Sequence, residues 1–117
     1  MRVRRAERED IERFSDIASK PTVKAWVGEV DGEIVGMAGF ALFKGRWIGF
    51  CDIVDRTRIG KITMARAAIR VLDEARKEGI KYVYAEVDTN EPTAMRWLTS
   101  LGFEPDPRTA YLYRWSA

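Results

Sequence analysis

The sequence predicts one α+β domain over residues 1–117, with a mixed, mostly antiparallel sheet and helices on both of its faces. The length of 117 residues is typical of a single domain. An Asp-Gly pair between two β-rich runs indicates a hairpin, and later segments switch to helical periodicity. The predicted element order is β-α-β-β-β-α-β-α-β, a pattern that favours the α+β class.

The chain begins with an expected edge strand and an expected helix. Residues 1–5 alternate weakly and indicate a short edge strand. Residues 7–20 carry apolar side chains at helical spacing, and Pro21 helps to end that helix.

Two tight turns predict a meander of three antiparallel strands. Asp31-Gly32 separates two β-rich runs within residues 24–43, and such a pair suits a two-residue turn with positive φ. Lys44-Gly45 indicates a second turn. Residues 46–54 are apolar on both faces, so we expect a central, buried strand there.

A long helix is expected from Gly60 to about Gly79. Arg76 and Lys77 in its last turn favour the helix dipole. Its expected core face comprises Ile62, Ala65, Ile69, Leu72 and Ala75.

The rest of the chain predicts strand, helix and strand. Residues 81–87 indicate a strand and residues 109–115 the last strand. Residues 88–103 indicate a helix, with Asn90 as a plausible N-cap and Gly102 as a C-cap.

Charge is unevenly distributed along the chain. A net charge of +2 argues against a nucleic-acid binder. Five basic residues without an intervening acid nevertheless form a local patch: Arg56, Arg58, Lys61, Arg66 and Arg70. This patch is interpreted as a phosphate site, with a solvated face and a nucleic-acid surface as alternatives.

The cysteine and histidine content excludes several kinds of chemistry. Cys51 is the only cysteine, so no intrachain disulfide is expected, and we interpret it as a buried apolar residue rather than a nucleophile. The absence of histidine excludes Ser-His-Asp and Cys-His catalysis within one chain, and no metal site is expected. No membrane span or signal peptide is expected, which favours a cytoplasmic protein.

Three motifs together resemble the GNAT superfamily of acyl-coenzyme A N-acyltransferases. They are GEVDGEIVGMAGF around the Asp-Gly turn, the strand, loop and helix from Cys51 to Gly79, and DTNEPTAMRWLTSLGFEP. The resemblance implies the GNAT fold and transfer of an acetyl group from acetyl-CoA to a primary amine by direct attack. The acceptor would be a small molecule or a protein.

The resemblance also implies a coenzyme site. The family's loop, R/Q-x-x-G-x-G/A, binds pyrophosphate through backbone N–H groups at a helix N-terminus. Residues 59–64 align with it, but Gly60 is its only glycine, so the motif is degenerate. Side chains at glycine positions can block the approach of phosphate, but the backbone donors remain and Arg58, Lys61 and Arg66 could bind the phosphates instead. The implied coenzyme-binding residues are Ile53, Val54, Arg58, Gly60, Lys61, Ile62, Thr63, Met64 and Asn90.

Two carboxylates are candidates for the base that deprotonates the amine. Glu86 shares a strand face with Tyr82 and Tyr84, where the family often places a base. Asp52 is expected to be buried, which would raise its pKa towards a useful value. The alternatives are that Asp52 pairs with Arg58 or caps a turn, and that Glu86 is simply solvated.

Two further departures from the family pattern bear on function. Leu98 stands where many members have the tyrosine that protonates the leaving thiolate. The link between the first helix and second strand is short, so the family's second helix is missing and the acceptor side is expected to be open. The alternative function is therefore a catalytically inactive GNAT-fold interaction or structural protein.

The C-terminal sequence suggests an origin. Its LGF helix end and terminal YRW resemble bacteriophage-encoded GNAT-like proteins. This resemblance implies a phage-encoded chain, with virion localisation and a virion protein partner as an alternative to the cytoplasm. A homodimer is also left open.

Overall fold

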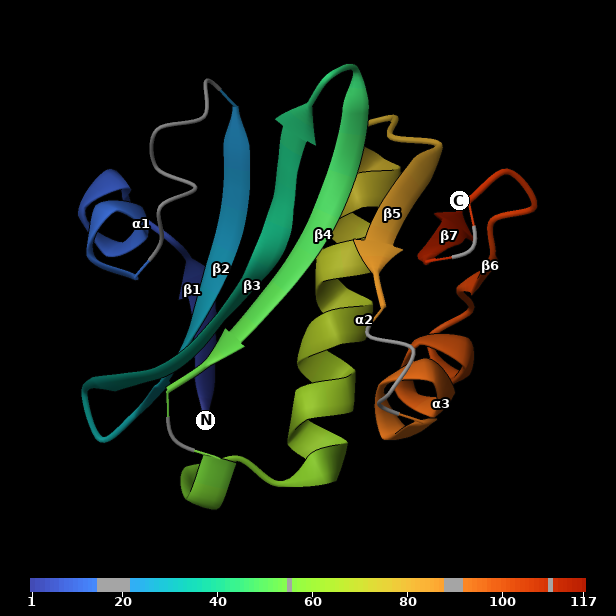
Figure 1. Cartoon of the computed structure of the whole chain (residues 1–117). Helices are drawn as coiled ribbons and strands as arrows, with labels where there is room; N and C mark the ends of the chain where they lie inside the picture. The colour runs from blue at the N-terminus through green and yellow to red at the C-terminus, as the bar shows by residue number, and fades with distance from the viewer. Residues whose placement is uncertain (15–21, 55, 88–91, 110) are drawn as a thin grey trace.

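The computed structural model describes residues 1–14, 22–54, 56–87, 92–109 and 111–117 (Figure 1). It consists of a seven-stranded sheet in the order β1-β2-β3-β4-β5-β7-β6. One helix, α1, lies against one face, and α2 and α3 pack on the other. The expected α+β class, with a mostly antiparallel sheet and helices on both faces, is confirmed.

The element order follows the expected one, with two additions. The elements are β1 (Arg2–Arg5), α1 (Arg8–Phe14), β2 (Val23–Val30), β3 (Glu33–Phe43), β4 (Arg46–Ile53), the 3-10 turn η2 (Arg56–Arg58), α2 (Lys61–Lys77), β5 (Tyr82–Glu86), α3 (Pro92–Ser100), β6 (Glu104–Pro105) and β7 (Leu112–Ser116). The pattern did not predict η2 or the two-residue β6. The expected first helix beyond Phe14, and the expected N-cap Asn90, lie outside the described residues.

Both predicted turns of the meander are present. Asp31 and Gly32 have φ of 52° and 79°, and Lys44 and Gly45 have φ of 50° and 80°. Two consecutive positive φ values are characteristic of the two-residue turns whose twist matches antiparallel strands. The turns set a register in which Ala38 of β3 lies opposite both Trp26 of β2 and Cys51 of β4.

Strand β4 is central but only partly buried, so the expectation of a fully buried strand was wrong. Cys51 and Asp52 near its end are exposed. The reason lies in its pairing with β5, which is parallel and in register only at Ile48 and Tyr84. Beyond that pair β4 lacks a neighbouring strand on one side.

Two apolar clusters lie on opposite faces of the sheet. Strand residues alternate between faces, so Trp26 and Phe40 face α2, whereas Val27 and Met37 face α1. The α2-side cluster also includes α3 and β7 side chains, among them Trp115, with Trp97 packed against it.

The predicted core face of helix α2 is confirmed at Leu72 and Ala75 and wrong at Ile62 and Ile69. Val71, Leu72 and Ala75 are buried as part of the core, but Ile62 and Ile69 are 71% and 50% exposed. The last two are seven residues apart and lie on the flank of the buried stripe, so their assignment to the core face was wrong. Among the described residues, no helix is long and apolar enough to cross a membrane.

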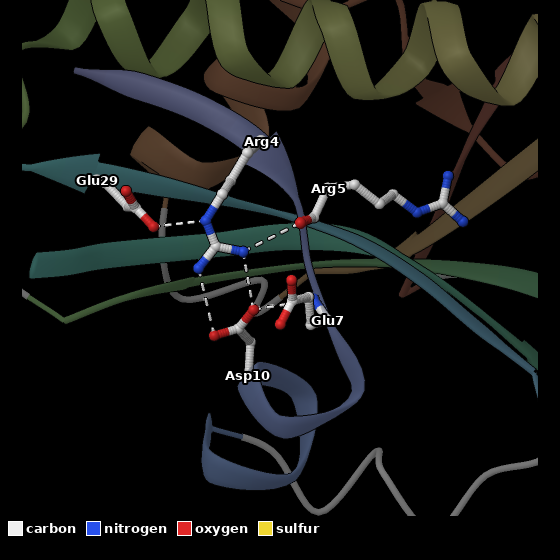
Figure 2. Close-up of polar contacts among 5 residues, drawn as sticks. All are labelled: Arg4, Arg5, Glu7, Asp10 and Glu29. Carbon is white, nitrogen blue, oxygen red and sulfur yellow. Dashed lines mark hydrogen bonds and ion pairs between the residues drawn. The ribbon is translucent and has the colours of Figure 1, made fainter. Parts of the chain in front are cut away.

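Polar contacts of Arg4 join β1, β2 and α1. Figure 2 shows its guanidinium between Glu29 of β2 and Asp10 of α1, donating hydrogen bonds to both carboxylates. Asp10 also accepts a 2.8 Å hydrogen bond from the backbone N–H of Glu7 at the start of α1. The bonds to Asp10 and Glu29 raise the pKa of Arg4 above its usual range, so the guanidinium of this link stays protonated.

Candidate functional site

A cavity of about 270 Å³ lies where β4 and β5 separate. The two strands are paired at Ile48 and Tyr84, and the cavity is lined by residues that follow this pair on both strands. On β4 these are Gly49, Phe50, Cys51, Asp52 and Ile53, and on β5 they are Ala85 and Glu86. The missing strand contacts thus leave a gap in the centre of the sheet, and α2 and α3 supply its remaining walls.

The N-terminus of α2 presents unpaired amides. Gly60 is its N-cap, in an extended conformation with φ of −72° and ψ of 155°, and no side chain caps the helix. The first intrahelical bond runs from the Met64 N–H to the Gly60 carbonyl, at 3.0 Å. The N–H groups of residues 61–63 therefore have no acceptor within the helix. Because the first turn contains no acidic residue, this end of the dipole favours an anion.

The bulky side chains in the degenerate loop do not fill the gap. Lys61 and Ile62 are exposed, and neither they nor Thr63 line the cavity. Met64, one turn into α2, and Ile53, at the end of β4, do line it. A β-carbon at Gly60 would meet no atom within 4 Å. The side chains of residues 61–63 therefore leave the cavity unfilled.

Arg58 is directed to the β2–β3 hairpin. Its guanidinium donates hydrogen bonds of 2.9 Å to Glu33 and 3.0 Å to the Val30 carbonyl, and it lies 3.9 Å from Asp31. These contacts fix η2 against the hairpin. The alternative in which Arg58 pairs with Asp52 is not what the structure shows.

The two candidate bases lie on one face of the sheet, on either side of the gap. Asp52 is opposite Met37, which faces α1, and Glu86 is two residues from Tyr84, which shares the face of its partner Ile48. Both side chains are exposed and both line the cavity. The structure thus brings Asp52 and Glu86 to the same opening. The expectation that Asp52 is buried was wrong, because β5 has separated from β4 at this point and only β3 remains paired with it.

The remaining predicted residues differ in whether they lie at the cavity. Val54 is 58% exposed, and its N–H donates to the Val35 carbonyl at 2.9 Å, so its backbone continues the β3–β4 pairing. Asn90 lies outside the described residues. Leu98 is buried and lines the cavity, so an apolar side chain stands at the position of the family's tyrosine.

Of the five predicted basic residues, the four whose side chains the structure describes do not form one surface. Arg58 binds the hairpin, and Arg70 donates a 3.3 Å hydrogen bond to the Val3 carbonyl on β1. Lys61 and Arg66 are exposed on α2. Dispersal in several directions weakens the case for a continuous nucleic-acid surface.

The small residues that line the cavity were not among the predicted site residues. Gly36, Ala38 and Gly49 on the strands, and Ala67 and Ala68 on α2, all line it. A run of small residues at alternating strand positions is the signal that could have indicated this space. Cys51 was also misjudged, because it is exposed at the same gap.

The chain matches a known protein family and one curated relative. Residues 2–103 match the model of the Acetyltransferase (GNAT) family. The chain is 27% identical over 99 residues to the uncharacterized N-acetyltransferase YjgM of Escherichia coli, which covers 81% of this chain. The chain spans 59% of the length of that relative.

Solved structures share the fold. An N-acetyltransferase from Staphylococcus aureus Mu50 superposes with a TM-score of 0.74 at 16% identity, covering 98% of this chain and 97% of its own. The YncA protein of Salmonella typhimurium, solved with its cofactor acetyl-CoA, gives 0.74 at 17% identity, covering 98% and 92%. The family match extends over most of the chain and the gap lies within it, so this protein belongs to the GNAT family of acetyltransferases.

Proposed function

We propose that the protein transfers an acetyl group from acetyl-CoA to a primary amine. The observation that carries this proposal is the position of the uncapped α2 N-terminus beside an open gap between β4 and β5. The α2 N-terminus offers amide donors to an anion, and the gap offers room for a narrow ligand. Family membership and the acetyl-CoA complex of a structural neighbour support the assignment.

The residues at the gap fit coenzyme A. The amides of residues 61–63 are free to donate to the pyrophosphate, and Lys61 adds a positive charge nearby. Ile53 and Met64 border the gap and are suited to the uncharged arm of the coenzyme. Of the other predicted residues, Val54 and Ile62 are exposed and do not line the cavity, and Arg58 would first have to leave the hairpin.

The coenzyme supplies an activated acyl thioester. The amine nitrogen attacks the carbonyl carbon, a C–N bond forms, the C–S bond breaks and the thiolate leaves. Glu86 or Asp52 accepts the proton that the amine loses, directly or through water. A free lysine amine of pKa about 10.4 is neutral in only roughly one part in 2,500 at pH 7, so this proton transfer matters. Since Leu98 has no proton to give, the thiolate leaves without the family's usual acid.

The acceptor reaches the site from the face that carries α1. Ile11 of α1 packs over β2 and β3, while Tyr82 of β5 remains 45% exposed and Glu86 is exposed. That open face suits an amine on a small molecule or at the surface of a protein. A virion or homodimeric partner, a phage origin and the cellular location remain predictions.

Calorimetry with acetyl-CoA tests the donor site. We expect binding that weakens at least tenfold in Lys61→Glu, because the new carboxylate repels the pyrophosphate. Lys81→Glu is the matched control, since it makes the same charge change at an exposed position after α2. Alkylation of the single thiol, Cys51, provides a second measurement, because a ligand in the gap should slow it. Absence of binding at millimolar acetyl-CoA would refute the proposal.

The alternative function is a catalytically inactive GNAT-fold protein, and the apolar Leu98 favours this alternative. Transfer assays on a panel of primary amines separate the two. Acetyl-CoA binding without any acetylated product or free thiol would support the alternative.

A further inference from the structure

The cavity extends far beyond the gap between β4 and β5. It continues between α2 and the sheet as far as β1–β3, where its walls include Val3 of β1, Trp26 of β2 and Phe40 of β3. Small residues line the space on the sheet, Gly36 and Ala38, and on α2, Ala67 and Ala68, and their short side chains leave it unfilled. One continuous cavity therefore connects the candidate reaction site to the interior.

The deep part of this cavity is apolar. Among the described residues that line it, Asp52 and Glu86 carry the only charged side chains, and both are exposed at the gap. In the described part of the chain, no buried polar side-chain atom lacks a hydrogen-bond partner. The amide groups of a pantetheine arm would be costly to bury there, because the helix wall presents alanine, valine and leucine side chains.

An apolar occupant fits these properties. A dry apolar cavity of roughly 150 Å³ already binds benzene, and this one has a volume of about 270 Å³. The reacting carbonyl would lie near Asp52 and Glu86, so a chain attached to that carbonyl has direct access to the interior. A linear saturated chain needs no hydrogen-bond partner and can follow a narrow space between helix and sheet.

We propose that the cavity binds the acyl chain of donors longer than acetyl, so that the protein uses medium-chain acyl-CoA thioesters. This inference rests on the proposed function, and it names the donor class for the same site. The chemistry is unchanged: the C–N bond to the amine forms, the C–S bond breaks and the proton of the amine goes to the carboxylate or water. The buried chain adds affinity and takes no part in the reaction.

A chain-length series tests the proposal on the unmodified protein. Calorimetry is performed with CoA and with its acetyl, butyryl, hexanoyl and octanoyl thioesters, below their micellar concentrations. We expect Kd to fall roughly fourfold for each buried methylene until the cavity is full. Equal Kd values along the series, with CoA itself bound, would overturn this inference and leave the proposed function standing. Failure of CoA and all thioesters to bind would overturn both.

A cavity-filling variant locates the chain. Ala68→Leu places a larger side chain in the cavity wall, and we expect the ratio of octanoyl-CoA to acetyl-CoA affinity to fall at least tenfold. Ala65→Leu is the matched control, because Ala65 is half-buried on the same helix but does not line the cavity. An unchanged ratio in Ala68→Leu would show that the chain binds elsewhere and would overturn the inference. If circular dichroism shows that Ala68→Leu is unfolded, Ala67→Val provides the smaller change.

Discussion

Gly49 of β4 and Val83 of β5 approach so closely that a β-carbon at position 49 would lie 3.1 Å from Val83 Cγ1. This contact lies next to the Ile48–Tyr84 pair, beyond which the two strands separate. Strands β4 and β5 therefore pack closely at the point where the gap between them begins. A side chain larger than hydrogen at position 49 would press against Val83, so glycine there allows the two strands to pack closely at the start of the gap.

Removal of the base should reduce turnover while leaving donor binding intact. We expect Glu86→Gln to lower kcat by about 10²–10⁴-fold at pH 7, because the amide cannot accept the proton of the amine. Asp52→Asn should have a smaller effect, since the shorter side chain reaches less far from its strand. Steady-state kinetics with calorimetry of acetyl-CoA would measure this. Full activity in both variants would show that water alone is the base.

A side-chain cap at Gly60 should change stability and affinity in opposite directions. Gly60→Asp provides the missing N-cap at a position with open space around it, so the free energy of unfolding should rise by about 0.5–1 kcal/mol. The same carboxylate occupies the α2 amides and repels phosphate, so acetyl-CoA affinity should fall at least tenfold. Denaturant unfolding and calorimetry measure the two effects.

Gly60→Asn separates the two contributions in that experiment. It caps the helix without adding charge, so we expect similar stabilisation and a smaller loss of affinity. If Gly60→Asp bound acetyl-CoA as well as the unmodified protein, the α2 N-terminus would not be the anion site.

Arg58 should contribute to stability more than to donor binding. Its hydrogen bonds to Glu33 and Val30 hold η2 on the hairpin, and Glu33 is largely exposed, so Arg58→Ala should cost about 0.5–1 kcal/mol. Acetyl-CoA affinity should change by less than about threefold, well below the effect of Lys61→Glu. A tenfold loss would show instead that Arg58 leaves the hairpin to bind phosphate.

The fold could be predicted where local chemistry decides the structure. Asp31-Gly32 and Lys44-Gly45 dictate their turns through backbone conformation, and those turns fix the order of the meander. The limits of α2 could also be predicted, because Gly60 and Gly79 lie on either side of a segment with helical periodicity.

The site depends on contacts between distant segments, so it was harder to predict. The loss of pairing between β4 and β5 exposes Asp52, and nothing in the alternation of residues 46–54 reports that loss. Arg58 was predicted as a phosphate ligand from its place in the sequence, but its direction depends on a hairpin about 25 residues earlier in the chain. The cavity likewise depends on small residues in elements that meet only after folding.

The contacts of Arg4 have a consequence for how the N-terminal region orders. Helix α1 is seven residues long, and helices shorter than about 12–15 residues are marginal in isolation. Its order therefore comes from Asp10, which Arg4 holds, and from Ile11, which packs on β2 and β3. Because Arg4 of β1 also donates to Glu29 of β2, the order of α1 depends on the pairing of β1 with β2.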